Sequence, residues 1–134
     1  MEKEIYKVFY VLQENIFPVD LELTEKEDVV EIKFCSADFM IQKQGDNYFD
    51  TLIEIRKDLE KQNIKLLCKG CSKYVYPSAM LLSMGTGEKA YVLTYGKRAK
   101  MESLVNIFDS CSVDEYATIQ EQLEYYKGWI KSLR

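Results

Sequence analysis

Apolar and polar side chains alternate along two stretches near the start of the chain, and each stretch predicts a β-strand. Glu4–Leu12 is rich in β-branched and aromatic residues but alternates poorly, which predicts a largely buried strand. Val29–Cys35 alternates from its second residue onward, which predicts a strand with one buried face. Phe17-Pro18 is expected to end the first strand, and the acidic residues after it predict a charged loop or a strand at a sheet edge.

Three further stretches carry apolar side chains at helical spacing. Asp46-Asn47 supplies an N-cap for a helix that is expected to extend to Gln62. Thr118 and Glu121 have the spacing of a capping box, and they predict a final helix with a continuous apolar face. Met101–Phe108 has a similar periodicity, which predicts a short additional helix.

Shorter segments complete the predicted order of elements. Phe39–Gln42, Ile64–Cys68 and Lys89–Tyr95 have the composition of strands, and Ser78 is expected to cap a short helical turn. This order predicts an α+β fold: a mostly antiparallel sheet of four to five strands with two or three helices packed on one face. One parallel pair of strands, joined through the first long helix, is compatible with the same order.

Length and composition place the chain among ordinary globular proteins. A length of 134 residues is typical of one domain, so we expect residues 1–134 to form a single globular unit. Apolar residues make up 47% and charged residues 30% of the chain. The sequence has no long apolar run and no signal-peptide pattern, which predicts a cytoplasmic protein with reduced cysteines.

The sequence contains no histidine, which is the most common general base and the most common metal ligand in proteins. The carboxylates cluster in polar stretches, where nothing predicts the burial that acid–base catalysis requires. We therefore predict a protein without enzymatic activity and without a cofactor.

The net charge of −4 is distributed unevenly along the chain. Residues 1–31 carry nine acidic and three basic side chains, whereas residues 61–100 carry one acidic and eight basic side chains. Either the two blocks neutralise each other in the fold, or one of them contacts a charged partner. The basic block and the ten tyrosines are compatible with binding of single-stranded nucleic acid, but the acidic chain as a whole disfavours it.

Cys68 and Cys71 form a C-x-x-C motif that has three interpretations. A redox site is disfavoured because the residues after Cys71 have the pattern of an extended chain, whereas a reactive cysteine is expected at the start of a helix. A zinc site would need Cys35 and Cys111 as its remaining ligands. The favoured interpretation is a pair of structural cysteines, and no metal site is predicted.

The segment Gly85–Lys89 has part of the pattern of a phosphate-binding loop. In that pattern a lysine follows the second glycine directly and a helix begins there. Here Glu88 takes that position and a predicted strand follows. A glycine turn is therefore the favoured interpretation.

Several short motifs in the second half of the chain resemble a group of small bacterial cytosolic proteins. The motifs are V-Y-P-S, M-G-x-G, A-Y-x-L and L-V-x-I-F within Val75–Asp109, followed by T-x-x-x-Q and S-L in the last helix. Two positions depart from the pattern, since Ala79 stands in place of glycine and Cys71 in place of serine or alanine. Some members resemble immunity proteins of secreted-toxin systems, which implies an accessory or immunity role.

Taken with the charge pattern, the resemblance predicts a protein-binding module that neutralises a toxin by direct binding. The expected partner is a protein, with a basic toxin domain as the candidate, rather than a membrane or a nucleic acid. The expected contact residues are Asp20, Glu22, Glu25, Glu27 and Asp28. The alternative is a small-molecule-binding protein or a small enzyme with a pocket near Tyr74–Ser78, lined by Tyr74, Tyr76, Ser78 and Lys89.

Overall fold

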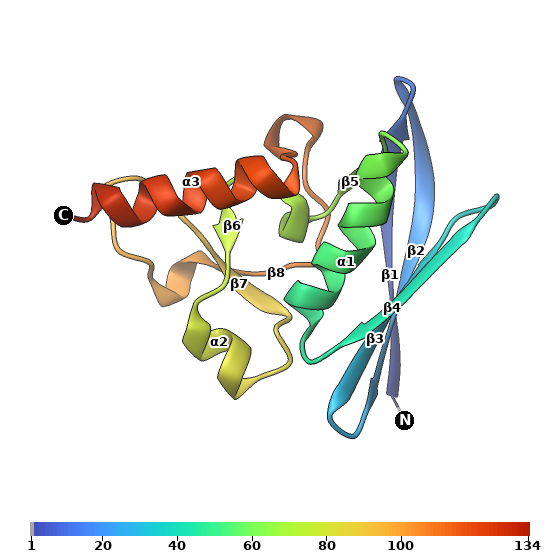
Figure 1. The fold of residues 1–134 in the computed structure, drawn as a ribbon, viewed down its shortest axis with the longest axis horizontal. Helices are drawn as coiled ribbons and strands as arrows, with labels where there is room; N and C mark the ends of the chain where they lie inside the picture. The colour runs from blue at the N-terminus through green and yellow to red at the C-terminus, as the bar shows by residue number, and fades with distance from the viewer. Residues whose placement is uncertain (1) are drawn as a thin grey trace.

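A five-stranded antiparallel sheet forms one side of the molecule in the computed structural model, which describes residues 2–134 (Figure 1). The strands lie in the order β4-β3-β2-β1-β5, and all neighbouring pairs are antiparallel. The predicted α+β fold with a mostly antiparallel sheet is confirmed. The strands are β1 (Glu2–Leu12), β2 (Asn15–Lys26), β3 (Val29–Cys35), β4 (Met40–Gly45) and β5 (Lys65–Leu67).

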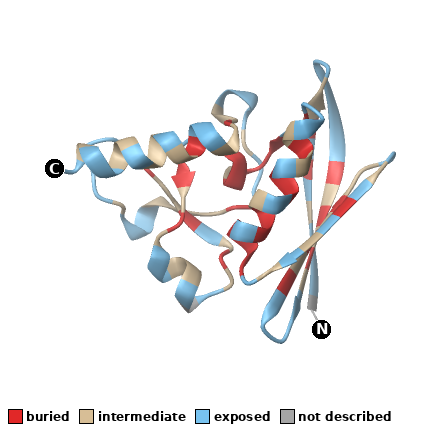
Figure 2. Ribbon diagram, in the orientation of Figure 1, coloured by how far each residue is buried: buried red, intermediate tan, exposed pale blue. Residues whose placement is uncertain are grey.

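The helix α1 (Tyr48–Lys61) covers one face of this sheet. Asn47 caps it as predicted, because its side-chain oxygen accepts a hydrogen bond from the Asp50 amide at 2.8 Å. The helix lies between the large sheet and the second half of the chain, and it is buried on both sides (Figure 2). Phe49, for example, packs against Tyr76 of the second half. Since β4 and β5 are the two edges of the sheet, α1 connects strands that are not neighbours, and the described strands form no parallel pair. The sheet residues of the core are Val8, Tyr10, Val19, Leu21, Leu23, Val30, Ile32, Phe34, Ile41 and Leu66.

The second half of the chain forms a three-stranded sheet and two more α-helices, on the same side of the large sheet as α1 (Figure 1). Ser78 caps α2 and a Thr118–Glu121 capping box begins α3, as predicted. No helix in the described part of the chain is long and apolar enough to cross a membrane. The elements are β6 (Val75–Tyr76), α2 (Ala79–Met84), β7 (Lys89–Val92), β8 (Leu104–Asn106) and α3 (Ile119–Ser132), with short 3₁₀ turns at Lys69–Cys71, Met101–Ser103 and Val113–Glu115.

Arg56 connects α1 to the second half of the chain and is only 2% exposed. Its guanidinium donates to the carbonyls of Gly70 and Ala117, each at 3.1 Å, and to Oε1 of Gln122 at 2.7 Å. Gln122 in turn donates from Nε2 to the carbonyls of residues 70, 72 and 75, each at 2.9 Å. These two side chains satisfy buried carbonyls of a segment with little regular structure of its own.

The strand β2 continues through Phe17-Pro18 and the acidic residues that follow, so the predicted strand end at Phe17-Pro18 and the charged loop are wrong. The alternative of a strand is correct, although β2 lies inside the sheet and not at its edge. Pro18 lies opposite Phe9 of β1, whereas β3 pairs with β2 only from Asp20 onward. At Pro18 the strand therefore has a free side, where the missing N–H is tolerated. The first strand ends earlier, at a turn in which Gln13 and Glu14 have φ angles of 51° and 68°.

Two other predictions, a helix over Met101–Phe108 and a largely buried first strand, are wrong. Met101–Phe108 is one 3₁₀ turn followed by β8, which pairs with β7, rather than a helix. Eight residues are too few for a stable helix without strong packing, so strand pairing prevails. The strand β1 is buried on one face only, since Ile5 and Phe9 on its other face are 52% and 49% exposed.

Candidate functional site

The five acidic residues that were expected to contact a partner lie in three places. Asp20 and Glu22 project from the open face of the large sheet, which is the face turned away from α1. Glu25 lies at the end of β2 on the side of α1, and Glu27 and Asp28 form the turn between β2 and β3. The fold therefore keeps the last three together and separates them from the first two.

Lysines compensate the acidic pair on the open face. Lys3 Nζ lies 2.9 Å from Glu22 Oε1, and this hydrogen-bonded ammonium lowers the pKa of the Glu22 carboxyl. Lys33 stands opposite Glu22 on β3, and Lys7 stands opposite Asp20 on β1. The open face is therefore a surface of mixed charge rather than an acidic one.

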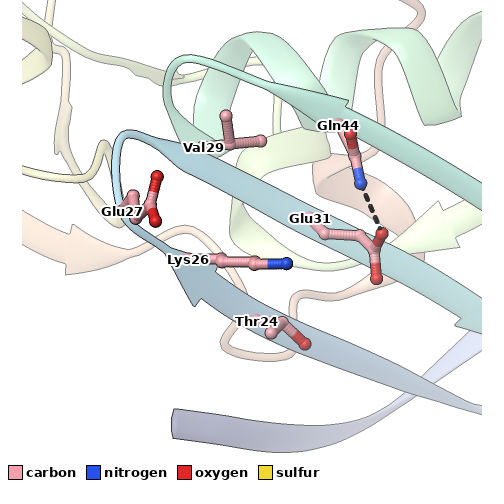
Figure 3. Close-up of a pocket in the computed structure, with 6 residues that line it drawn as sticks. All are labelled: Thr24, Lys26, Glu27, Val29, Glu31 and Gln44. Carbon is pink, nitrogen blue, oxygen red and sulfur yellow. Dashed lines mark hydrogen bonds between the residues drawn. The ribbon is translucent and has the colours of Figure 1, made fainter. Parts of the chain in front are cut away.

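A depression of about 460 Å³ lies on the open face near the turn between β2 and β3 (Figure 3). Glu31 at its wall accepts hydrogen bonds from the side chains of Gln42 at 2.6 Å and Gln44 at 2.9 Å. These donors lower the pKa of Glu31 and occupy its carboxylate. The carboxylate in this depression is therefore already hydrogen-bonded to side chains of the neighbouring strand. Its lining residues are Thr24, Lys26, Glu27, Val29, Glu31 and Gln44.

A second group of carboxylates lies where β1 and β2 meet the start of α1, at the lower end of the sheet in Figure 1. Glu4 and Glu25 come from the two strands, and Glu88 comes from the segment before β7. We call these three residues, with Glu27 and Asp28 of the adjacent turn, the acidic end. Among the described residues, no lysine or arginine forms an ion pair with any of the five.

The glycine motif at residues 85–89 places Glu88 in this group. The Thr86 carbonyl accepts a hydrogen bond from the Tyr48 amide at 2.7 Å and so satisfies a free donor at the start of α1. Gly87 has a φ of 84°, and a Cβ at this position would lie 3.1 Å from the Asn47 side chain. Only glycine lets the loop pack this closely. The loop covers the helix terminus that a phosphate would need, which fits the interpretation as a glycine turn.

The charges of Glu4 and Glu25 act on Glu88, the third carboxylate next to α1. The Tyr6 hydroxyl donates to Glu4 Oε2 at 3.4 Å and accepts from Asn106 Nδ2 at 3.0 Å. Partial burial raises the pKa of Glu88, and the charges of Glu4 and Glu25 raise it further. A positive ligand at this position would relieve the repulsion.

The cysteines do not assemble into a four-sulfur site. Cys68 and Cys71 are fully buried with their Sγ atoms 3.7 Å apart, whereas Cys35 lies on β3 with its Sγ 3.7 Å from Glu22 Oε2. Two strands separate β3 from β5, which leads into Cys68. Burial raises the pKa of the Cys111 thiol to about 12. Within the described chain, no group of three or more cysteine or acidic side chains is arranged to hold a metal.

The alternative pocket near Tyr74–Ser78 is a cavity of about 70 Å³. Tyr76 and Ser78 line it, and Tyr76 stacks on Tyr126 with ring centroids 4.0 Å apart. Tyr74 instead packs edge-on against Tyr125, and Lys89 lines a different depression. This volume is far below the roughly 300 Å³ that a metabolite site usually needs.

Comparison of the chain with models of known protein families gives no match, and neither does comparison with curated proteins. The proposed function therefore rests on the arrangement of the residues at the acidic end. Glu4 and Glu88 were not among the predicted contact residues. The alternation along β1 already places Glu4 on the same face as the buried Val8, but no local pattern indicates where Glu88 lies.

Proposed function

We propose that this protein is a non-enzymatic binding module whose acidic end contacts a basic surface of a partner protein. The partner that best fits the resemblance is a toxin domain, which the module would neutralise by direct binding. The supporting observation is that five carboxylates at one end of the molecule have no ion-pair partner among the described residues. Elsewhere in the same half, acids such as Glu22 and Asp58 are paired with Lys3 and Lys43.

Concentrated negative charge at an exposed end accelerates association with a basic partner and makes it sensitive to salt. Glu25, Glu27 and Asp28 are exposed and therefore available for such an encounter. Asp20 and Glu22 are less suited to it because lysines on the neighbouring strands already compensate them.

The test is to co-express the chain with the polypeptide encoded by the neighbouring gene and to measure growth and the association rate of the purified pair. We expect Glu27→Lys with Asp28→Lys to slow association at low salt by about tenfold and to weaken protection. The matched control is Glu14→Lys with Asp20→Lys, which makes the same charge change away from the acidic end and should alter the rate by less than about twofold. Equal slowing by both pairs, or no complex at all, would contradict the proposal.

A further inference from the structure

The turn that follows β7 holds a tyrosine ring in a defined place on the surface of α3. Gly96 has a φ of 79°, and its amide donates to Oγ of Ser132 at 2.8 Å. The indole of Trp129 donates to the Lys97 carbonyl at 2.9 Å. These two bonds attach the turn to the C-terminal part of the helix (Figure 1). The ring of Tyr95 in this turn is therefore fixed in position although it is 50% exposed.

Gly128 of α3 makes room for this ring. A Cβ at this position would collide with the Tyr95 hydroxyl and lie 3.0 Å from its Cζ. Glycine lowers the stability of a helix relative to alanine, so the close approach of the ring is what the glycine provides. The centroid of the Tyr95 ring lies 4.7 Å from that of Tyr125, and Tyr74 packs edge-on against the same ring at 5.1 Å. Two of these three contiguous rings are open to solvent, since Tyr74 is 39% exposed.

Five exposed basic side chains lie around these rings. Two belong to the same turn as Tyr95, two belong to the part of α3 on which that turn packs, and the fifth has its Nζ 5.9 Å from the centroid of the Tyr125 ring. Among the described residues, none of the five forms an ion pair. We call this group the basic end: Lys97 and Arg98 of the turn, Lys127 and Lys131 of α3, and Lys73.

Two carboxylates lie beside the rings, but they do not cancel this charge. Glu121 and Glu124 help to line a depression of about 420 Å³ that also contains Tyr95 and Tyr125. Glu121 is engaged in capping α3, because its Oε1 accepts a hydrogen bond from the Thr118 amide at 2.9 Å. The acidic end lies on the other side of the molecule, far from the C-terminal part of α3 (Figure 1). The net charge of −4 of the whole chain therefore does not describe this surface.

Exposed aromatic rings beside unpaired cations have the chemistry that binds single-stranded nucleic acid. Bases stack on aromatic side chains whatever their sequence, and lysine and arginine side chains contact the phosphates. A lipid surface with acidic headgroups would use the same cations. It would not need an aromatic ring that a helix glycine and two hydrogen bonds hold in one place, so the geometry favours nucleic acid.

We propose that Tyr95 and Tyr74 stack against bases of a single-stranded nucleic acid whose phosphates contact the basic end. This binding site is separate from the acidic end and does not depend on the proposed function. Contact through few bases and few phosphates gives weak binding that tolerates any sequence and decreases as the salt concentration rises.

The test is a fluorescence anisotropy titration at low salt with labelled oligothymidylate and, separately, oligouridylate, each of about twelve nucleotides. We expect dissociation constants on the order of 10⁻⁵ M. Tyr95→Ala removes the exposed ring and should weaken binding by about tenfold. The matched control is Phe9→Ala, because Phe9 is an aromatic residue of nearly equal exposure, 49%, on the open face of the large sheet. It should change the affinity by less than about twofold.

A second pair of variants tests the phosphate contacts. Lys97→Gln with Arg98→Gln should weaken binding by about tenfold and make it less sensitive to salt. Lys57→Gln with Lys61→Gln removes two exposed lysines from α1 and is the matched control. It should change the affinity by less than about twofold and leave the salt dependence as it is.

Thermal melting of each variant verifies that it folds. The inference is wrong if neither oligonucleotide binds, if Tyr95→Ala loses no more affinity than Phe9→Ala, or if the two charge-removing pairs have equal effects. Cosedimentation with phosphatidylglycerol vesicles tests the other source of phosphate, and binding to vesicles without binding to either oligonucleotide would overturn the inference. Tighter binding of one oligonucleotide supports it and shows whether DNA or RNA is the preferred ligand.

Discussion

Glu88 sits beside Glu4 and Glu25, and this position gives the folded protein a measurable dependence on pH. Partial burial and the two neighbouring charges raise its pKa above the ordinary value of 4.5 in the folded state only. The folded chain therefore binds this proton more tightly than the unfolded chain. The ionised carboxyl opposes folding at neutral pH, and the opposition is relieved as the pH falls through the raised pKa toward the ordinary one.

We expect Glu88→Gln to increase the free energy of unfolding at neutral pH, by less than about 1 kcal/mol because the side chain is partly exposed. The gain should shrink when the same measurement is made near about pH 3.5, where the wild-type carboxyl is protonated in both states. Urea unfolding at the two pH values measures this, with Glu14→Gln as the control. A gain that is larger in acid than at neutral pH would contradict the assignment.

Arg56 is buried and hydrogen-bonded to the second half of the chain, so its replacement should destabilise the fold. Arg56→Met keeps much of the packing volume but leaves the carbonyls of Gly70 and Ala117 with fewer donors or none. We expect the free energy of unfolding to fall by roughly 2–4 kcal/mol in denaturant titrations. Lys57→Met, on the exposed side of the same helix, is the matched control and should change stability by less than about 0.5 kcal/mol. Similar losses in both variants would show that Arg56 has no special role.

Residue-level features could be predicted where they depend on neighbours in sequence. Asn47 caps α1 through the Asp50 amide, and Thr118 forms its capping box with Glu121. In each case the two residues are three positions apart, so the cap can be recognised from the sequence. The bond between Arg56 and Gln122 joins residues 66 positions apart, and the sequence holds no local sign of it. The same limit applies to Glu88, whose position depends on packing of its loop against α1.

At the scale of elements, the large sheet has one buried and one open face, and substitutions on the two faces should differ sharply. Leu21 of β2 is 0% exposed and Ile16 of the same strand is 60% exposed. We expect Leu21→Ala to lower the free energy of unfolding by about 2–5 kcal/mol and Ile16→Thr by less than about 0.5 kcal/mol. Chemical denaturation of the two variants measures this directly. A large loss for Ile16→Thr would mean that its face is covered, for example in an oligomer, which size-exclusion chromatography would detect.

The elements that the sequence predicted correctly have a regular pattern of apolar residues, and the helices among them also have an N-cap. α1 and α3 combine both, and β3 has clean alternation, so each appears near its expected bounds. For β2 the sequence leaves a charged loop and an edge strand open, because Pro18 and a run of acids resemble a loop. In the structure Asp20 and Glu22 occupy alternate positions of a central strand opposite Lys7 and Lys33. For β1, apolar side chains on both faces predict burial, but the face that carries Ile5 and Phe9 is open.

At the scale of the whole molecule, only part of the predicted contact surface is brought together. Residues 1–31 are rich in acids, but charge counted along the chain does not show which lysines lie across a strand. The register places Lys33 opposite Glu22, and Lys3 forms an ion pair with the same carboxylate, while Glu25, Glu27 and Asp28 reach the end of the sheet without such partners. Glu4 and Glu88 join these residues only because the fold brings them to the same end of the sheet.

The placement of the cysteines across the whole fold gives a last prediction. A zinc site would need sulfurs from β3, from the 3₁₀ turn after β5 and from Cys111, and two strands lie between Cys35 and the buried pair. We therefore expect excess EDTA and one equivalent of zinc to leave the melting temperature unchanged in differential scanning calorimetry. Cys35→Ser, which alters the sulfur most distant from the buried pair, should behave identically with and without zinc. A melting temperature that falls with EDTA and is restored by zinc would show instead that a metal holds these segments together.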